Sequence, residues 1–199
     1  MQDDVALQVL GQFTPEGKLT PGYSDHYIFL VGRDDCHGIM HYLLSNETLE
    51  HDANMYGYDD EILNADIMNQ IKNPNMVVQL TLDKSQASGV HEKKILSADE
   101  VSDAEGFAND IAIGESATHQ ISHTKAGVCI GLNLAYEGSM NWSESGEGQN
   151  ISLVPGVNSV TGFKAQNNTL VISSNPIFIS RLRTKLRAEH AIAKAQENK

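Results

Sequence analysis

The sequence has little that would anchor it to a membrane or staple it with disulfides. It contains two cysteines, Cys36 and Cys129, among 199 residues, too few for a disulfide framework. Cys129 lies in an apolar stretch, so we expect it to be a buried thiol in a strand. No apolar run is long enough to cross a bilayer, and residues 1–4 are acidic where a secretory leader would be basic. We therefore expect a cytoplasmic protein with no stable membrane association.

Positive charge is also scarce. Lysine and arginine number 14 against 26 aspartates and glutamates, a net charge of −12. Such a surface repels phosphate backbones, so any binding to nucleic acid should be sensitive to salt. The basic residues near the C-terminus form either a solvated helix face or a patch that follows phosphates: Arg181, Arg183, Lys185, Arg187, Lys194 and Lys199.

The length and composition suit a single domain over residues 1–199, without internal repeats. Residues 1–24 predict a strand near Leu7–Leu10 and then loops, and residues 176–199 predict a C-terminal helix. Further strands are expected at Tyr27–Val31, Asn54–Tyr58, Met76–Leu82, His123–Cys129, Leu132–Tyr136 and Thr169–Ser173, and further helices at Asp34–Leu44 and Asp59–Ile71. The strand–helix–strand order indicates a crossover between parallel strands. The predicted fold is therefore α/β, a mixed β-sheet sandwiched by helices.

Two short motifs carry the chemistry of the chain. His123 and Lys125 are two residues apart, so on a strand both side chains point to one face. Soon afterwards the run from Gly138 presents the hydroxyl of Ser139 and the amide of Asn141. A nucleophile, a fixed positive charge and neutral hydrogen-bond donors are what transfer at a phosphodiester requires.

This ordered set resembles the phospholipase D superfamily, whose signature is His-x-Lys, four residues, Asp, and then Gly-Ser-x-Asn. Trp142-Ser143, which often follows in the family, is also present. The chain departs from the pattern at Ile130, which stands where the family has Asp, and the spacing to Gly138 is one residue longer. In the family this Asp supports the hydrogen bonds of the site, a role that the apolar Ile130 does not fill.

The resemblance also implies a polar residue just before the next strand. Asn167 is the best match there and Asn168 is its neighbour, while Asn150 competes if residues 148–164 are an insertion. In the family a histidine attacks phosphorus and a second histidine protonates the leaving oxygen. Because this chain has one motif, the resemblance implies a homodimer with His123 of both subunits at a twofold axis.

Each residue then has an implied role. His123 is the nucleophile or acid, Lys125 supplies charge, Ser139 and Asn141 donate hydrogen bonds, and Asn167 or Asn168 orients the histidine. Substrate contacts are further expected from Trp142 and from the polar segment after Leu82, as ligands bind at the carboxyl ends of strands. The candidates in that segment are Lys84, Gln86, His91 and Glu92, and residues 56–60 after the preceding strand are placed in the same way.

No cofactor is expected. His37 and His41 have the spacing of neighbouring turns of a helix, but the sequence shows no third ligand, so no metal site is predicted.

The function predicted from these residues is a metal-independent phosphodiesterase, foremost a Nuc-type nuclease acting on DNA or RNA. The alternatives are a phospholipase or phosphatidyl-transferring enzyme and a degenerate module that binds nucleic acid or protein without catalysis. The lipid enzymes of the family usually carry two motifs in a longer chain, and no amphipathic membrane-binding segment stands out here.

Overall fold

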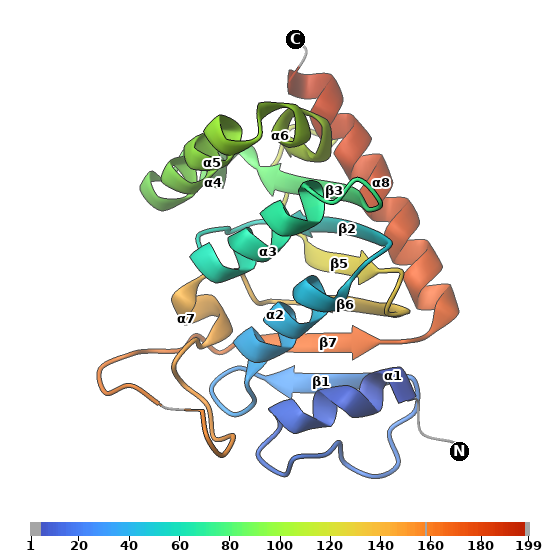
Figure 1. The fold of residues 1–199 in the computed structure, drawn as a ribbon, viewed down its shortest axis with the longest axis vertical. Helices are drawn as coiled ribbons and strands as arrows, with labels where there is room; N and C mark the ends of the chain where they lie inside the picture. The colour runs from blue at the N-terminus through green and yellow to red at the C-terminus, as the bar shows by residue number, and fades with distance from the viewer. Residues whose placement is uncertain (1–4, 158, 198–199) are drawn as a thin grey trace.

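The protein is described by a computed structural model that covers residues 5–157 and 159–197. Its centre is a seven-stranded sheet in the order β1-β7-β6-β5-β2-β3-β4 (Figure 1). The strands are β1 (His26–Leu30), β2 (Glu50–Met55), β3 (Val77–Asp83), β4 (Ile111–Gly114), β5 (Lys125–Cys129), β6 (Leu134–Gly138) and β7 (Thr169–Ser173). The helices are α1 (Val5–Gln8), the 3-10 helix η1 (Val9–Phe13), α2 (Cys36–Asn46), α3 (Glu61–Ile71), α4 (Lys84–Ala87), α5 (Val90–Ser102), α6 (Ala104–Asp110), α7 (Glu144–Glu147) and α8 (Pro176–Glu197).

The sheet is mixed, as the sequence predicts. Strands β2, β3 and β4 run parallel, and the other neighbouring pairs are antiparallel. Helix α3 makes the expected crossover between β2 and β3. The α/β fold predicted from the sequence is therefore confirmed.

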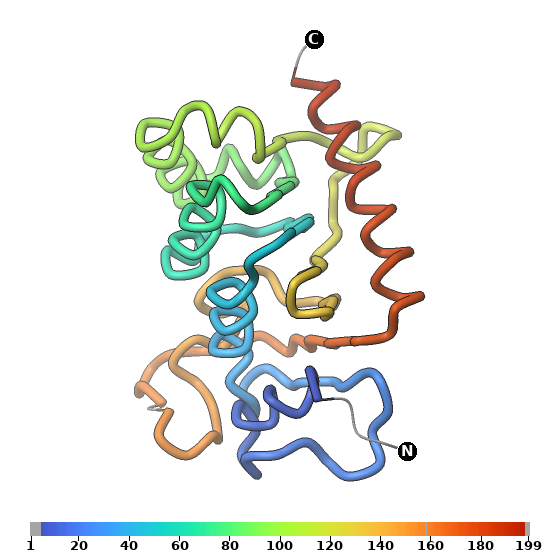
Figure 2. The backbone as a smooth tube through the Cα atoms, turned by 45° about the vertical axis from the view of Figure 1, so that its right-hand side comes forward, coloured from blue at the N-terminus to red at the C-terminus, as the bar shows by residue number. Residues whose placement is uncertain are grey.

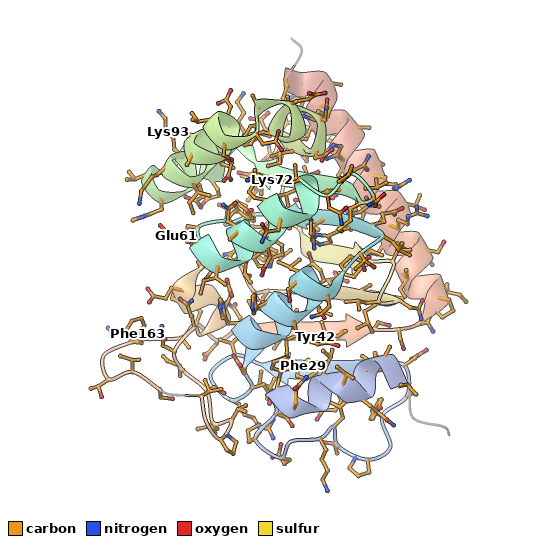
Figure 3. All side chains as sticks on the ribbon, viewed as in Figure 1. Phe29, Tyr42, Glu61, Lys72, Lys93 and Phe163 are labelled. Atoms are coloured by element: carbon orange, nitrogen blue, oxygen red, sulfur yellow. The ribbon has the colours of Figure 1, made fainter. Side chains whose placement is uncertain are left out.

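Helices cover both faces of the sheet. The long α8 lies alone across one face, and the other helices lie on the opposite face (Figures 1 and 2). The larger apolar core fills the space between those helices and the sheet, where Phe29 of β1 is buried and Tyr42 of α2 packs against Phe13 (Figure 3). A smaller core lies under α8 and includes Ala126, Val128, Ala135, Ile179, Leu182 and Leu186.

Aspartates at the start of several helices explain where these helices begin. The Asp35 carboxylate accepts a hydrogen bond from Gly38 N, and Asp60 accepts from the first turn of α3. Asp83 and Asp103 cap α4 and α6 in the same way. Each carboxylate satisfies backbone donors that the helix leaves unpaired.

The contact between β2 and α8 is polar, unlike the rest of the core. Alternate residues of a strand point to one face, and on β2 the residues Glu50, Asp52 and Asn54 bond side chains of α8. Their partners are Arg183, Arg187 and Glu189. This side of the sheet is thus held to α8 by charge as well as by apolar packing.

The C-terminal turn of α8 reaches the outer edge of the sheet. The Glu197 side chain accepts a hydrogen bond from Ile113 N at 2.6 Å, and Gln196 accepts one from Glu115 N at 2.7 Å. Strand β4 is the last strand of the sheet, so these side chains take up backbone donors along its open side.

Both cysteines are buried and unpaired, which agrees with the thiol predicted for Cys129. No helix among residues 5–157 and 159–197 is long and apolar enough to cross a membrane.

Several elements differ from the sequence prediction. The strand expected at Asn54–Tyr58 is β2, which begins at Glu50 and ends at Met55. The strand expected at Leu7–Leu10 is helical, because Leu7 and Leu10 recur at helical spacing and both are fully buried. The segment after Leu82, expected as a loop, forms α4 and the start of α5. Strand β4 was not predicted, since four residues give too short a pattern. Residues 148–164 hold no regular element where they are described, and Phe163 lies far out on this loop (Figure 3).

Candidate active site

The motif residues meet where strands of the sheet begin and end, on the left side of the sheet in Figure 1. Strand β2 ends at Met55, which pairs with Lys125 at the start of β5. Next to β5, strand β6 ends at Gly138, and β7 begins opposite it. The antiparallel order therefore brings the residues that follow β2 and β6 close to those that begin β5 and β7.

The ring of Tyr56 contacts both His123 and Lys125. The His123 and Tyr56 ring centroids are 4.6 Å apart, and Lys125 Nζ lies 4.8 Å from the centroid of the same ring. His123 is exposed, whereas Lys125 is 6% exposed. The structure thus places the two motif side chains together, with the histidine accessible to a substrate.

The positive charge of Lys125 is not neutralised within the described chain. Its Nζ donates to the His123 carbonyl at 3.1 Å, and no carboxylate of residues 5–157 and 159–197 lies within ion-pair distance of it. Burial lowers the pKa of this ammonium from its usual value. A phosphate would therefore gain a strong interaction with it.

The turn after β2 connects the two halves of the motif. Tyr56 contacts His123, and the next residue, Gly57, donates its N–H to Asn141 Oδ1 at 3.2 Å. The Tyr56 hydroxyl accepts a hydrogen bond from Gln86 Nε2 at 2.9 Å. Asn141 therefore has its carbonyl oxygen occupied and retains its amide protons for another acceptor.

Ser139 pairs with Asn168 and not with Asn167. The Ser139 hydroxyl donates to Asn168 Oδ1 at 3.0 Å and accepts from Thr169 N at 3.1 Å. Asn168 Nδ2 donates to the Gly146 carbonyl at 2.9 Å. The structure brings Asn168 to the motif, whereas Asn167 is exposed and makes no such bond within the described chain. Asn150 lies on the following loop, where its carbonyl binds Val160 N.

The fold of the chain is shared with solved structures. No protein-family model matches the sequence, and no curated protein matches it. Nuc from Salmonella typhimurium, a phospholipase D family member, has 12% identity and a TM-score of 0.57 over 83% of this chain and 94% of its own. NucT from Helicobacter pylori has 12% identity and a TM-score of 0.59 over 82% and 94%. Phosphatidylserine synthase from Haemophilus influenzae Rd KW20 has 11% identity and a TM-score of 0.56 over 79% of this chain and 35% of its own. This chain has the phospholipase D fold.

In this phospholipase D fold, a buried network that the sequence did not reveal holds the segment before His123. Ser122 N donates to Asp83 Oδ2 at 2.5 Å, and Asn54 Nδ2 donates to the Ser122 hydroxyl at 2.9 Å. Asn54 also binds Glu189 of α8. The four residues of this network lie far apart in the sequence, so no local spacing could have predicted that they meet.

One of the expected substrate contacts differs from the sequence prediction, and the contact expected of Lys84 stays a prediction. Trp142 is fully buried, and its ring centroid lies 5.7 Å from that of Tyr58 and 6.3 Å from that of Tyr136. The side chain therefore supports the motif loop, residues 138–143, and cannot touch a substrate. Lys84 is exposed on α4 and makes no bond to the motif residues. Gln86 reaches the site through Tyr56.

Most basic side chains of the C-terminal helix form ion pairs within the chain, which neither of the two sequence-based interpretations predicted. Arg183 pairs with Glu50 and Asp52, and Arg187 pairs with the same two carboxylates. Lys185 and Lys194 also have acidic partners on α8, while Lys199 lies outside the described residues. These four basic side chains are therefore neutralised by ion pairs within the chain, whereas the exposed Arg181 has no ion-pair partner among the described residues.

A second polar cluster, the His37–Asp60–Glu147 cluster, lies behind the motif loop. His37 Nδ1 is 2.6 Å from Glu147 Oε2 and 3.6 Å from Asp60 Oδ2. Burial raises the pKa of Glu147 to about 8, although the hydrogen bond with His37 opposes this shift. Burial lowers the pKa of His37, but the hydrogen bond and charge of Glu147 outweigh it and leave the pKa raised. The sequence pointed to His37 and missed its two partners, which are far away in the chain.

Proposed function

We propose that this protein is a phosphodiesterase that cleaves nucleic acid through a phosphohistidine intermediate. The observation that carries the proposal is the grouping of His123 and Lys125 on the Tyr56 ring, at the sheet edge that also holds Ser139 and Asn141. An accessible imidazole beside an unneutralised ammonium suits attack on a phosphate ester.

The proposed reaction has two steps. His123 attacks phosphorus, a nitrogen–phosphorus bond forms, and the bond to the leaving oxygen breaks. A second His123, from another copy of the chain, gives its proton to that oxygen and then takes a proton from the water that hydrolyses the intermediate. Lys125 and the amide group of Asn141 stabilise the non-bridging oxygens. Asn168 holds Ser139 in place, so we assign the downstream position to Asn168 and not to Asn167.

The extent of the structural match favours nucleic acid over lipid as the substrate. The chain matches 94% of Nuc and of NucT, but 35% of the phosphatidylserine synthase. This chain has one motif, so a complete pair of histidines requires two copies. Ile130, which stands where the family has Asp, packs against the apolar core under α8.

Cleavage assays with labelled DNA and RNA, single- and double-stranded, in the presence of EDTA test this proposal. We expect the wild-type protein to cleave at least one of them and His123→Asn to lose about 10³-fold or more, as removal of a nucleophile does. His119→Asn is the matched control, because His119 is exposed, lies in the same segment, and has a positive φ of 56° that asparagine tolerates.

Retained turnover in His123→Asn would contradict the assigned nucleophile. If the wild-type protein cleaved none of the four nucleic acids, the nuclease proposal would be wrong. The same assay on phosphatidyl esters and on small diesters would then separate a lipid enzyme from a binding module.

A further inference from the structure

We propose that the His37–Asp60–Glu147 cluster is a binding site for a zinc ion. The three residues come from the first turn of α2, the residue before α3 and the last residue of α7. One ligand atom from each lies within 4.8 Å of the other two. Imidazole nitrogen with carboxylate oxygens is a ligand set that zinc accepts.

The carboxylates of the cluster are placed to bind a cation. Asp60 Oδ1 accepts from Ile62 N and Leu63 N, so it is used by the helix, while Oδ2 faces His37. The Glu147 side chain is 0% exposed, and its Oε1 has no hydrogen-bond partner among the residues that the structure describes. A buried carboxylate oxygen without a partner costs free energy, which a coordinated ion would recover.

Charge points to the same ligand. Among residues 5–157 and 159–197, His37 is the only basic side chain within ion-pair distance of Asp60 or Glu147. Two carboxylates and one imidazole leave net negative charge in a mostly buried place, and a divalent cation balances it.

The geometry needs little adjustment. Zinc ligands at 2.0–2.2 Å in a tetrahedron are about 3.3 Å apart. The present separations from His37 Nδ1 are 2.6 Å to Glu147 and 3.6 Å to Asp60. Shifts of less than about 1 Å, with loss of the proton between His37 and Glu147, give the two distances from His37. The oxygens of Asp60 and Glu147 lie within 4.8 Å of each other and would approach by at most about 1.5 Å. The His37 side chain is 15% exposed, so water can fill the remaining position.

The site would stabilise the motif loop. Glu147 follows that loop, and the Trp142 carbonyl accepts from Asp59 N at 2.8 Å and from Asp60 N at 3.1 Å. Zinc would thus join α2, α3 and α7 behind Asn141. His123 and Lys125 are not part of the cluster, so this inference is independent of the proposed function.

Titration of the full chain with zinc chloride tests the inference. Protein stripped with chelator and then dialysed is titrated in a calorimeter, and its thermal unfolding is followed with and without zinc. We expect one ion per chain with micromolar or tighter affinity, and at 100-fold excess over Kd a rise in Tm of about 5 °C or more. Magnesium chloride should give no comparable rise, because Mg²⁺ prefers oxygen ligands and retains its waters.

The matched variants are His37→Gln and His41→Gln. His41 lies one turn along α2 and also binds a carboxylate, with Nδ1 at 2.6 Å from Asp66 Oδ2. We expect His37→Gln to weaken zinc binding at least 10-fold and His41→Gln to leave it unchanged. Glu147→Gln keeps the side-chain shape and serves as the second variant if His37→Gln does not fold.

Equal zinc binding in His37→Gln and the wild-type protein, or no binding by the wild-type protein, would overturn the inference. The cleavage assay in EDTA is run below the Tm of the stripped protein. Loss of zinc then appears as a lower Tm, and a failure of the proposed chemistry appears as absent cleavage by a folded protein.

Discussion

At the scale of single residues, buried polar groups in this protein have specific partners, and His51 shows what this requires. His51 is 1% exposed, and its Nδ1 lies 2.9 Å from Gln70 Oε1. Its Nε2 lies 2.9 Å from the Tyr136 hydroxyl. A neutral imidazole donates at one nitrogen and accepts at the other, so it satisfies both partners. Burial lowers the pKa of His51 to about 4.

This histidine should make stability depend on pH. The ordinary pKa of histidine is 6.5. Below this pH, His51 takes up a proton in the unfolded chain but stays neutral in the folded protein. His51 therefore contributes stability that is present above pH 6.5 and is lost as the pH falls to about 4, up to about 3 kcal/mol. The free energy of unfolding in urea between pH 8 and pH 4 measures it.

In His51→Gln the loss of stability over this pH range should shrink, whatever the stability of the variant at pH 8. His119→Gln is the control, because His119 is exposed and its substitution should leave the profile unchanged. His190, whose pKa is also lowered to about 4 by burial, accounts for part of the slope that remains. A profile identical to that of the wild-type protein in His51→Gln would contradict this assignment.

The same scale shows how far the sequence predicts the site. His123, Lys125, Ser139 and Asn141 were predicted as site residues because their types and spacing form a local pattern. The structure brings the four side chains to the same end of the strands, and their role stays a prediction. The choice between Asn167 and Asn168 depends on which side chain turns toward Ser139, which spacing alone does not fix. The burial of Trp142 follows from rings contributed by other elements, which the motif does not contain.

At the scale of elements, α8 is attached to β2 by a charged cluster. Asp52 is 0% exposed, and Arg187 Nε donates to its Oδ2 at 2.8 Å. Arg187 also lies 3.0 Å from Glu50 Oε1, and Arg183 binds the same glutamate. Removing one member leaves a buried carboxylate with less compensation, which costs more than the pair contributes.

We expect Arg187→Met to destabilise the protein by about 2 kcal/mol, with the apolar stem of the side chain retained. Lys185→Met is the control on the same helix. Lys185 pairs with Glu189, but its side chain is 56% exposed, so the change should stay within about 0.5 kcal/mol. Denaturation midpoints at constant m-value give both numbers. Equal effects of the two substitutions would show that Asp52 does not depend on Arg187.

Elements with a long periodic pattern were predicted well. Helix α3 was expected from Ile62, Leu63, Ile67 and Ile71, and β7 was expected at the residues that form it. Strand β4 was not predicted because four residues give no clear period, and the segment Leu7–Leu10 was predicted as a strand although its two leucines have helical spacing. Helix α5 escaped for another reason, since its residues are mostly polar and only Ile95, Leu96 and Asp99 are buried.

At the scale of the whole molecule, the proposed chemistry needs two copies, because one chain supplies one His123. Subunit mixing tests this. If a productive site requires His123 from both chains, activity after exchange with excess His123→Asn should fall as the square of the wild-type fraction. If each chain acts alone, it should fall linearly. Wild-type protein mixed with His119→Asn is the control and should lose no activity.

The last turn of α8 determines whether the edge strand β4 is open to another copy of the chain. Gln196 and Glu197 accept hydrogen bonds from the backbone amides of Glu115 and Ile113. The last turn of α8 therefore blocks the open side of β4, where another strand could otherwise pair. A chain cut before Gln196 would retain its motif and most of its core. It would nevertheless present β4 as a template on which another copy could add a strand, so shortening this end invites self-association of the sheets and not loss of the fold.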